Sequence, residues 1–314
     1  MSRILVTGGT GFLARPLVEL LRRNLPPGRL QVTSLVPGPG VLKSDLLDAG
    51  SARRLVERTR PELVFHLAGM SASASTPPDV LWRVHVTATL NLFKALRALP
   101  SRARVVVVGS SREYGSAGAG RLRETSPTEP VGEYGASKLG QTLAALSFCR
   151  QGLDVRVARI FNVFGQGMPK TLALGSFASQ IAAIEAGVRP AQIRVGNLSS
   201  RRDYVDVRDV ARALALLARW GESGEVYNVC SGRSLTMKWL LRKMLSMSQT
   251  RIAVVLDPGR VRAGDVSSMA GSHAKLTRAT GWTPKVPLEK SLRDTLAWHR
   301  QAWGFREPEG RHIL

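Results

Sequence analysis

A glycine-rich turn near the N-terminus constrains this chain more than any other feature. A short aliphatic run over residues 4–6 stops at a turn that contains Gly8 and Gly11, and an apolar helical pattern then continues to Leu21. The two glycines permit backbone angles and a close approach that side chains would prevent, and the free N–H groups at the start of the helix attract an anion. The spacing Gly8-x-x-Gly11-x-x-Ala14 is a variant of the dinucleotide-binding fingerprint. The sequence therefore predicts a strand, turn and helix that hold a dinucleotide pyrophosphate.

The following residues alternate between strand-like and helix-like patterns, which is typical of a doubly wound parallel sheet. Strands are expected at 30–36, 63–69, 104–108 and 155–163, and helices at 52–60, 79–99 and 134–150. After Gly165 the alternation becomes irregular. We predict an α/β fold with a Rossmann-type doubly wound parallel sheet and a smaller mixed α/β C-terminal lobe. The expected NAD(P)-binding domain covers residues 1–165, residues 204–230 return to it, and the substrate-binding lobe covers residues 166–314.

The net charge of +22, from 45 Lys and Arg against 23 Asp and Glu, raises the question of a polyanionic partner. No run of basic residues exceeds two, and aromatic residues make up only 6% of the chain, whereas a nucleic-acid module usually concentrates its charge. We interpret the excess as a solvated arginine-rich surface that partly serves phosphate-bearing small molecules. Nucleic acid is not an expected partner.

Two cysteines, Cys149 and Cys230, lie far apart and form no C-x-x-C pair, so neither a disulfide framework nor a metal site is expected. The N-terminal apolar run is too short for a secretion signal, and no window approaches the length of a membrane span. We therefore expect a cytoplasmic protein without a membrane partner.

The second expected strand carries a signal about the cofactor. In NAD-preferring Rossmann folds an acidic residue near the end of this strand binds the ribose 2′-hydroxyl. Between Leu20 and Ser44 there is no acidic residue, which removes the repulsion against a 2′-phosphate, although no arginine stands at the strand tip. NADP(H) is therefore favoured, and NAD(H) remains possible. His66, in the next apolar strand, is interpreted as a hydrogen-bonded core residue without a chemical role.

Polar residues at the end of the fourth expected strand and on the helix after it indicate catalysis. Ser110 and Ser111 follow this strand, whose carboxyl end faces the ligand crevice. Tyr134 and Lys138 are spaced i, i+4 and share a helical face. A nearby ammonium is expected to lower the pKa of the phenol from about 10, which would make Tyr134 a usable proton donor. Further along, Arg202 is a candidate fork for a phosphate, with a solvated charged turn as the alternative.

Taken together, these residues resemble the extended short-chain dehydrogenase/reductase family in its nucleotide-sugar branch. The resemblance covers nearly the whole chain and is strongest to GDP-mannose 4,6-dehydratases and GDP-6-deoxy-4-keto-mannose reductases. It implies Ser110, Tyr134 and Lys138 as the catalytic set, and a homodimer formed through helices 79–99 and 134–150. The implied cofactor-binding residues are Gly8, Thr10, Gly11, Phe12, Leu13, Asp45, Leu46, Leu67, Ala68, Gly69, Tyr134, Lys138 and Phe161. The implied substrate-binding residues are Ser110, Ser111, Asn162, Arg202, Arg262 and Asp265.

Departures from the family pattern narrow the expected reaction. Ala14 replaces a third glycine, and His85 stands where the family usually has Asn. The dehydratases carry a Glu two residues after the catalytic hydroxyl, where this chain has Arg112. Water elimination needs that additional acid/base group, whereas reduction needs one proton and one hydride. We therefore expect NAD(P)H-dependent reduction of the C4 ketone of a nucleotide-linked 4-keto-6-deoxyhexose, with a GDP-linked sugar as substrate.

Three alternatives stay open. Glu113 is one residue away from the dehydratase position, so a 4,6-dehydratase requires that Glu113 reach the proton at C5. A 4-epimerase would keep its cofactor and recycle the hydride. A non-catalytic dinucleotide-binding protein would use its charge for RNA or an acidic partner, but the intact Ser110, Tyr134 and Lys138 argue against it.

Overall fold

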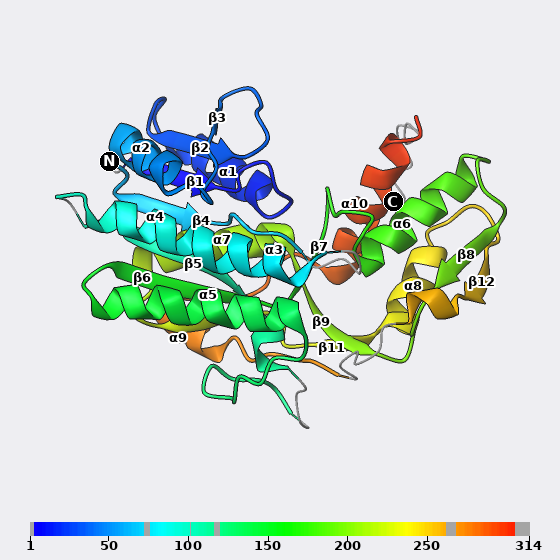
Figure 1. Cartoon of the computed structure of the whole chain (residues 1–314). Coiled ribbons are helices and arrows are strands. Elements are labelled where there is room, and N and C mark those ends of the chain that lie inside the picture. The colour runs from blue at the N-terminus through cyan, green and yellow to red at the C-terminus, as the bar shows by residue number, and fades with distance from the viewer. Residues whose placement is uncertain (1–2, 72–75, 101, 116–119, 262–267, 305–314) are drawn as a thin grey trace.

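A parallel sheet of seven strands forms the larger lobe of the molecule (Figure 1). The computed structural model describes residues 3–71, 76–100, 102–115, 120–261 and 268–304. The strand order β10-β6-β5-β4-β1-β2-β3 places β1 at the point where the winding reverses, which confirms the predicted Rossmann-type fold. The strands are β1 (Ile4–Thr7), β2 (Leu30–Ser34), β3 (Val41–Lys43), β4 (Leu63–His66), β5 (Arg104–Ser110), β6 (Asp154–Ile160) and β10 (Val226–Val229).

Helices cover both faces of this sheet, and the strands are apolar on both sides for that reason. Ile4 and Val6 of β1 pack into one apolar core, whereas Leu5 between them packs into the other. The first core lies under α1 (Ala14–Asn24) and α7 (Val207–Trp220), and α9 (Ala274–Thr280) packs against α7. The second core lies under α2 (Ala49–Thr59), α4 (Ala88–Arg97) and α5 (Glu133–Arg150).

The smaller lobe is built around one further apolar core (Figure 1). It contains α6 (Ala173–Glu185), α8 (Met237–Leu245), α10 (Leu288–Gln301) and a parallel pair formed by β8 (Gln192–Val195) and β12 (Ala253–Leu256). A three-stranded sheet of β7 (Asn162–Phe164), β9 (Arg201–Asp206) and β11 (Ser234–Thr236) lies between the two lobes. The chain crosses back after β9, because α7 packs against the large sheet and β10 pairs with β6.

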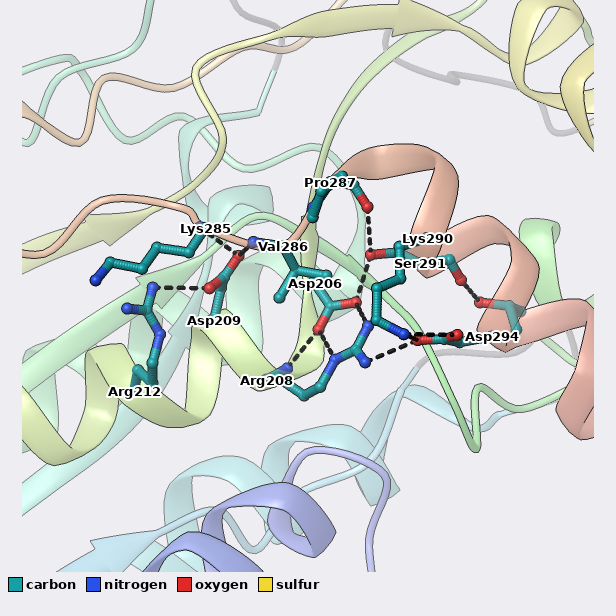
Figure 2. A network of polar contacts seen from close by, with 11 residues as sticks. Asp206, Arg208, Asp209, Arg212, Lys285, Val286, Pro287, Lys290, Ser291 and Asp294 are labelled. Carbon is teal, nitrogen blue, oxygen red and sulfur yellow. Dashed lines mark hydrogen bonds and ion pairs between the residues drawn. The ribbon is translucent and has the colours of Figure 1, made fainter. Parts of the chain in front are cut away.

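A network of polar contacts fastens α10 of the smaller lobe to the start of α7 (Figure 2). The carboxylate of Asp206 accepts hydrogen bonds from the Arg208 backbone and guanidinium and from Ser291 Oγ. Arg208 also pairs with Asp294 at 2.7 Å. One residue beyond Arg208, the Asp209 carboxylate accepts from the backbone N–H groups that precede α10. The orientation of the smaller lobe thus depends on buried carboxylates at the N-terminus of α7.

The structure differs from the sequence prediction where elements are short or irregular. The helix predicted over 79–99 is divided into α3 (Pro78–Trp82), a π-helical turn η1 (Arg83–Thr87) and α4. The strand predicted over 155–163 ends at Ile160, and β7 begins a separate sheet at Asn162. Strands β3, β8, β9 and β11 were not predicted, because most of them have three or four residues and show too little periodicity.

Candidate active site

The glycine-rich turn brings the carboxyl ends of three strands together. Gly8 has φ +66°, and a Cβ at this position would lie 2.7 Å from the backbone nitrogen of Ala68, which follows β4. Only glycine allows this approach. At the end of β2, the Thr10 and Ser34 hydroxyls are hydrogen-bonded at 2.8 Å. The resulting cradle of backbone, small side chains and hydroxyls at the start of α1 fits a dinucleotide pyrophosphate and ribose.

The other residues expected to bind the cofactor differ in their exposure and in their distance along the fold from the glycine-rich turn. Phe12 and Leu13 are half-buried at the start of α1, and Gly69 lies beside the His85 ring. Asp45 is exposed, and its carboxylate accepts from the backbone of Leu47. Leu46 is buried, as is Phe161. The Phe161 side chain lies in a separate apolar cluster with Tyr114, Leu122, Cys230 and Met269.

Ser110 and Tyr134 meet at the end of β5. Ser110 caps the short helix η2 (Ser111–Tyr114) by accepting from the backbone N–H of Arg112, and its side chain also lies within hydrogen-bonding reach of the Tyr134 hydroxyl. Burial raises the pKa of Tyr134, an effect that the Ser110 hydrogen bond partly offsets. The phenol is therefore held in its protonated form, in which it can donate to a developing alkoxide.

Lys138 is buried one helical turn further along α5. Its ammonium donates to the backbone carbonyl of Val108 and to Oε1 of Gln141. Burial lowers the pKa of Lys138 to about 8. The prediction that Lys138 lowers the pKa of Tyr134 is wrong for this structure, because desolvation of the phenol dominates and the charges that act on it come from Glu113 and Arg112.

Glu113 lies beside the backbone of Ser110 and is fully buried. Its Oε1 accepts from the Ser110 backbone N–H at 2.7 Å, and its Oε2 pairs with Nε and Nη2 of Arg159 at 2.9 Å each. The Arg159 guanidinium in turn stacks over the Tyr114 ring at 4.5 Å. Both carboxylate oxygens are thus committed to the interior of the fold, and Glu113 is a structural counter-ion.

The described residues expected to bind the substrate are divided between the end of β5 and the three-stranded sheet between the lobes. Ser111 is buried beside Ser110, and Asn162 at the start of β7 donates to the backbone carbonyl of Asp203. Arg202 is only 6% exposed and donates to the backbone carbonyl of Arg201. Arg262 and Asp265 fall outside the described residues.

Sequence reasoning missed the buried polar residues behind Tyr134 and Lys138. His85, in the π-helical turn, hydrogen-bonds Ser137 Oγ at 2.9 Å, and its ring packs edge-on against the Tyr134 ring with the two centroids 5.6 Å apart. The departure of His85 from the family pattern was the single sequence signal for this contact. The interpretation of His66 as a hydrogen-bonded core residue is confirmed, since its two ring nitrogens contact Thr7 and Thr89.

Within the described ranges, no group of three or more His, Cys, Asp or Glu side chains could hold a metal ion. None of the helices in that part of the chain is long and apolar enough to cross a membrane.

A Rossmann-type sheet with a glycine cradle, a Ser at the end of β5, and a Tyr and a Lys on the adjacent helix α5 defines a dinucleotide-dependent oxidoreductase of the short-chain type. Residues 4–230 match the NAD dependent epimerase/dehydratase family, and the chain belongs to it. The family resemblance predicted from the sequence is thereby confirmed.

Individual relatives narrow the comparison. A GDP-6-deoxy-D-mannose reductase from Pseudomonas aeruginosa is 34% identical over 305 residues, which cover 94% of this chain and 96% of the relative. A dTDP-6-deoxy-L-talose 4-dehydrogenase (NAD(P)(+)) from Kitasatospora kifunensis is 30% identical, with 93% and 94% of the two chains covered. Among solved structures, RMD from Pseudomonas aeruginosa complexed with NADPH aligns with a TM-score of 0.86 at 31% identity, covering 96% of this chain and all of that one.

Proposed function

We propose that this protein transfers a hydride from NAD(P)H to the C4 ketone of a nucleotide-linked 4-keto-6-deoxyhexose of the GDP-4-keto-6-deoxymannose type. The product is the corresponding 4-hydroxy sugar nucleotide. The named activities of the reductase and dehydrogenase relatives support this reaction class. The observation that carries the choice of reaction is the burial of Glu113 in its pair with Arg159.

Three side chains would perform the reduction. Tyr134 donates a proton to the oxygen at C4, and Ser110 hydrogen-bonds the same oxygen as negative charge develops on it. Lys138 holds the ribose next to the nicotinamide and supplies positive charge behind the site. The bound cofactor supplies the hydride, within the cradle formed by Gly8 and the residues after β4.

The alternatives need chemistry that this site does not favour. A 4,6-dehydratase needs a carboxylate that takes the proton at C5, and both oxygens of Glu113 are engaged away from the crevice. Arg112 occupies the position where such a carboxylate is expected. A 4-epimerase would return the hydride to the sugar, so net consumption of NAD(P)H distinguishes it from a reductase.

NADPH is the cofactor that we propose the protein prefers. Ser34 rather than an acidic residue ends β2, so no carboxylate there repels a 2′-phosphate. A pocket of about 540 Å³ beside Gly9 and Thr10 is lined by Arg22 and Arg23 of α1. Arg23 is paired with Glu19. Arg22 instead extends to the loop after β2, where its guanidinium lies beside Gly40: Nη2 would be 3.9 Å from a side-chain Cβ at that position. Arg22 is therefore placed to supply from the helix the positive charge that the strand tip lacks.

A homodimer and a cytoplasmic location complete the proposal. Trp82 of α3 and Leu143 of α5 are 41% and 59% exposed on the helices expected to form the dimer. Cys149 and Cys230 are both free thiols, as expected in a reducing compartment.

The role of Tyr134 tests the proposal directly. Tyr134→Phe removes the proton donor and leaves the ring, so turnover of the 4-keto sugar is expected to fall by about 10²-fold or more. The affinity for NADPH, measured by fluorescence titration, is expected to stay within about threefold because the glycine cradle is intact. Full turnover in Tyr134→Phe would overturn the assignment.

A further inference from the structure

A continuous chain of buried hydrogen bonds connects Lys138 with the glycine-rich turn. From Lys138 it passes through Gln141 on α5, Thr89 on α4 and His66 on β4 to Thr7, the last residue of β1. The links beyond Gln141 measure 2.9, 2.9 and 2.8 Å in that order. All five side chains are buried. The network therefore joins the proposed catalytic lysine to the cofactor cradle through the interior of the large lobe.

At the Lys138 end of the network, the type of each side chain determines which atom donates and which accepts. An ammonium can only donate, so Gln141 must present Oε1 to Lys138 and turn its Nε2 toward Thr89. The single hydroxyl proton of Thr89 goes to the backbone carbonyl of His85 at 2.6 Å. Thr89 Oγ1 is thereby an acceptor for Gln141, and the amide cannot turn over without breaking both of its contacts.

The same reasoning assigns the protons at the other end. Because Thr89 Oγ1 has given its proton away, His66 must donate to it from Nε2. His66 Nδ1 then accepts from the Thr7 hydroxyl, which accepts in turn from the backbone N–H of Ala68. Each contact in the network thus has one assigned donor. The hydrogen bonds run toward Thr89 Oγ1 from both ends, and Thr89 gives its own proton to the His85 carbonyl.

Titratable groups face Lys138 from several elements. His66 on β4 and His85 in η1 are neutral, because burial, reinforced by the charge of Lys138, lowers the pKa of each to about 3. The Glu113 carboxylate in η2 favours the charged form of Lys138, and burial raises the pKa of Tyr134 on α5. Of these groups, Lys138 is the one whose charge changes between pH 7 and 9, since its own pKa is lowered to about 8.

We propose that Gln141 is a positioning residue that keeps the Lys138 ammonium charged and aimed at the cofactor ribose, and that Thr89 and His66 hold Gln141 in the required orientation. This inference rests on the proposed role of Lys138 in cofactor binding. Gln141 touches neither cofactor nor substrate in this assignment and acts through Lys138.

The test measures the dissociation constant of NADPH against pH by fluorescence in the full-length protein. Wild-type affinity is expected to fall as the pH rises through about 8, where Lys138 loses its charge. Gln141→Leu removes an acceptor from the ammonium, so the midpoint should move down by about one pH unit and the affinity at pH 7.5 should drop about threefold. Gln141→Glu places a carboxylate there, so the midpoint should move up. Opposite shifts are not expected from a change in packing.

A matched pair of hydroxyl deletions tests the distal part of the network. Thr89→Val leaves the Gln141 amide without its acceptor and should move the midpoint in the same direction as Gln141→Leu, by a smaller amount. Thr142→Val is the control. Thr142 is buried on α5, next to Gln141 in the sequence, and its Oγ1 is the one buried side-chain polar atom of the described residues without a hydrogen-bond partner. Thr142→Val should leave the midpoint unchanged.

Three results would overturn the proposal: a wild-type affinity that does not change between pH 7 and 9, a Gln141→Leu midpoint equal to that of the wild type, or equal shifts in Thr89→Val and Thr142→Val. Thermal unfolding of each variant verifies that the protein is folded in the assay. Reduction of the 4-keto sugar is measured separately. A wild-type protein that shows the NADPH midpoint but does not reduce the sugar would refute the proposed reaction and leave the role of Gln141 supported.

Discussion

Glu113 is the residue that argues most strongly against a dehydratase reaction, because its carboxylate is part of the buried core. A carboxylate near the catalytic hydroxyl is what a dehydratase needs, but this one lies inside the protein between the Ser110 backbone and Arg159. Arg159 is itself only 3% exposed, and its charge needs a counter-ion there. The pair thus stabilises the end of β5, and in the proposed reaction Tyr134 transfers the proton.

The first prediction concerns this pair. Glu113→Gln leaves the Arg159 guanidinium buried without an opposite charge, so the free energy of unfolding should fall by about 3–5 kcal/mol. Chemical denaturation measures the change. Glu57→Gln, in an exposed pair with Arg53 on α2, is the control and should cost no more than about 1 kcal/mol. A Glu113→Gln protein of undiminished stability that had lost its activity would mean that Glu113 acts in the chemistry.

A second prediction at this scale concerns the choice of cofactor. Arg22→Gln should weaken NADPH binding by about tenfold and leave NADH binding unchanged, because only NADPH carries the phosphate that Arg22 would contact. Calorimetry with 2′,5′-ADP and 5′-AMP gives the same comparison without turnover. Arg278→Gln, an exposed charge deletion on α9, is the control. Equal weakening of both cofactors by Arg22→Gln would place the 2′-phosphate elsewhere.

Residues differ in how far sequence predicts them. Ser110, Tyr134 and Lys138 could be predicted as candidates because their side-chain types follow a strand or share a helical face at a fixed spacing. Gln141 and Thr89 carry no such signal, because their contact joins positions 52 residues apart on two helices. The burial that raises the pKa of Tyr134 was equally invisible, since desolvation depends on the packing of the whole lobe.

At the scale of elements, the large sheet was predictable and the junction between lobes was not. Strands such as β1 and β5 are covered on both faces, so they appear in the sequence as uninterrupted aliphatic runs. The π-helical turn of η1 interrupts a helix whose apolar pattern is continuous on either side of it. The lobes are joined by carboxylates at the start of α7, whose partners lie more than 70 residues away along the chain.

A third prediction tests that junction. Ser291→Ala removes the hydroxyl that donates to the buried Asp206 carboxylate, so the free energy of unfolding should fall by about 1–3 kcal/mol. Ser246→Ala is the control: this exposed hydroxyl donates to a carbonyl on the surface of the smaller lobe, and its loss should be close to neutral. Denaturation curves of the two variants that coincide would show that Asp206 does not depend on Ser291.

At the scale of the whole molecule, the two lobes divide the proposed task. The glycine cradle and the Ser, Tyr and Lys set belong to the larger lobe, whereas Asn162 and Arg202 lie on the strands between the lobes. A sugar nucleotide bound between them would meet the nicotinamide at the end of β5. The nucleotide's phosphates would then lie toward the smaller lobe, within the field of a chain whose net charge is +22.

The most direct test of this account compares two reactions of the purified protein. In the first, GDP-4-keto-6-deoxymannose and NADPH are mixed with the enzyme, and the absorbance of the reduced nicotinamide is followed. In the second, GDP-mannose and NADP are used, and a 4-keto product is sought. We predict stoichiometric oxidation of NADPH in the first reaction and no conversion in the second. Formation of a 4-keto sugar from GDP-mannose without net change in the cofactor would show a dehydratase and contradict the structural role assigned to Glu113.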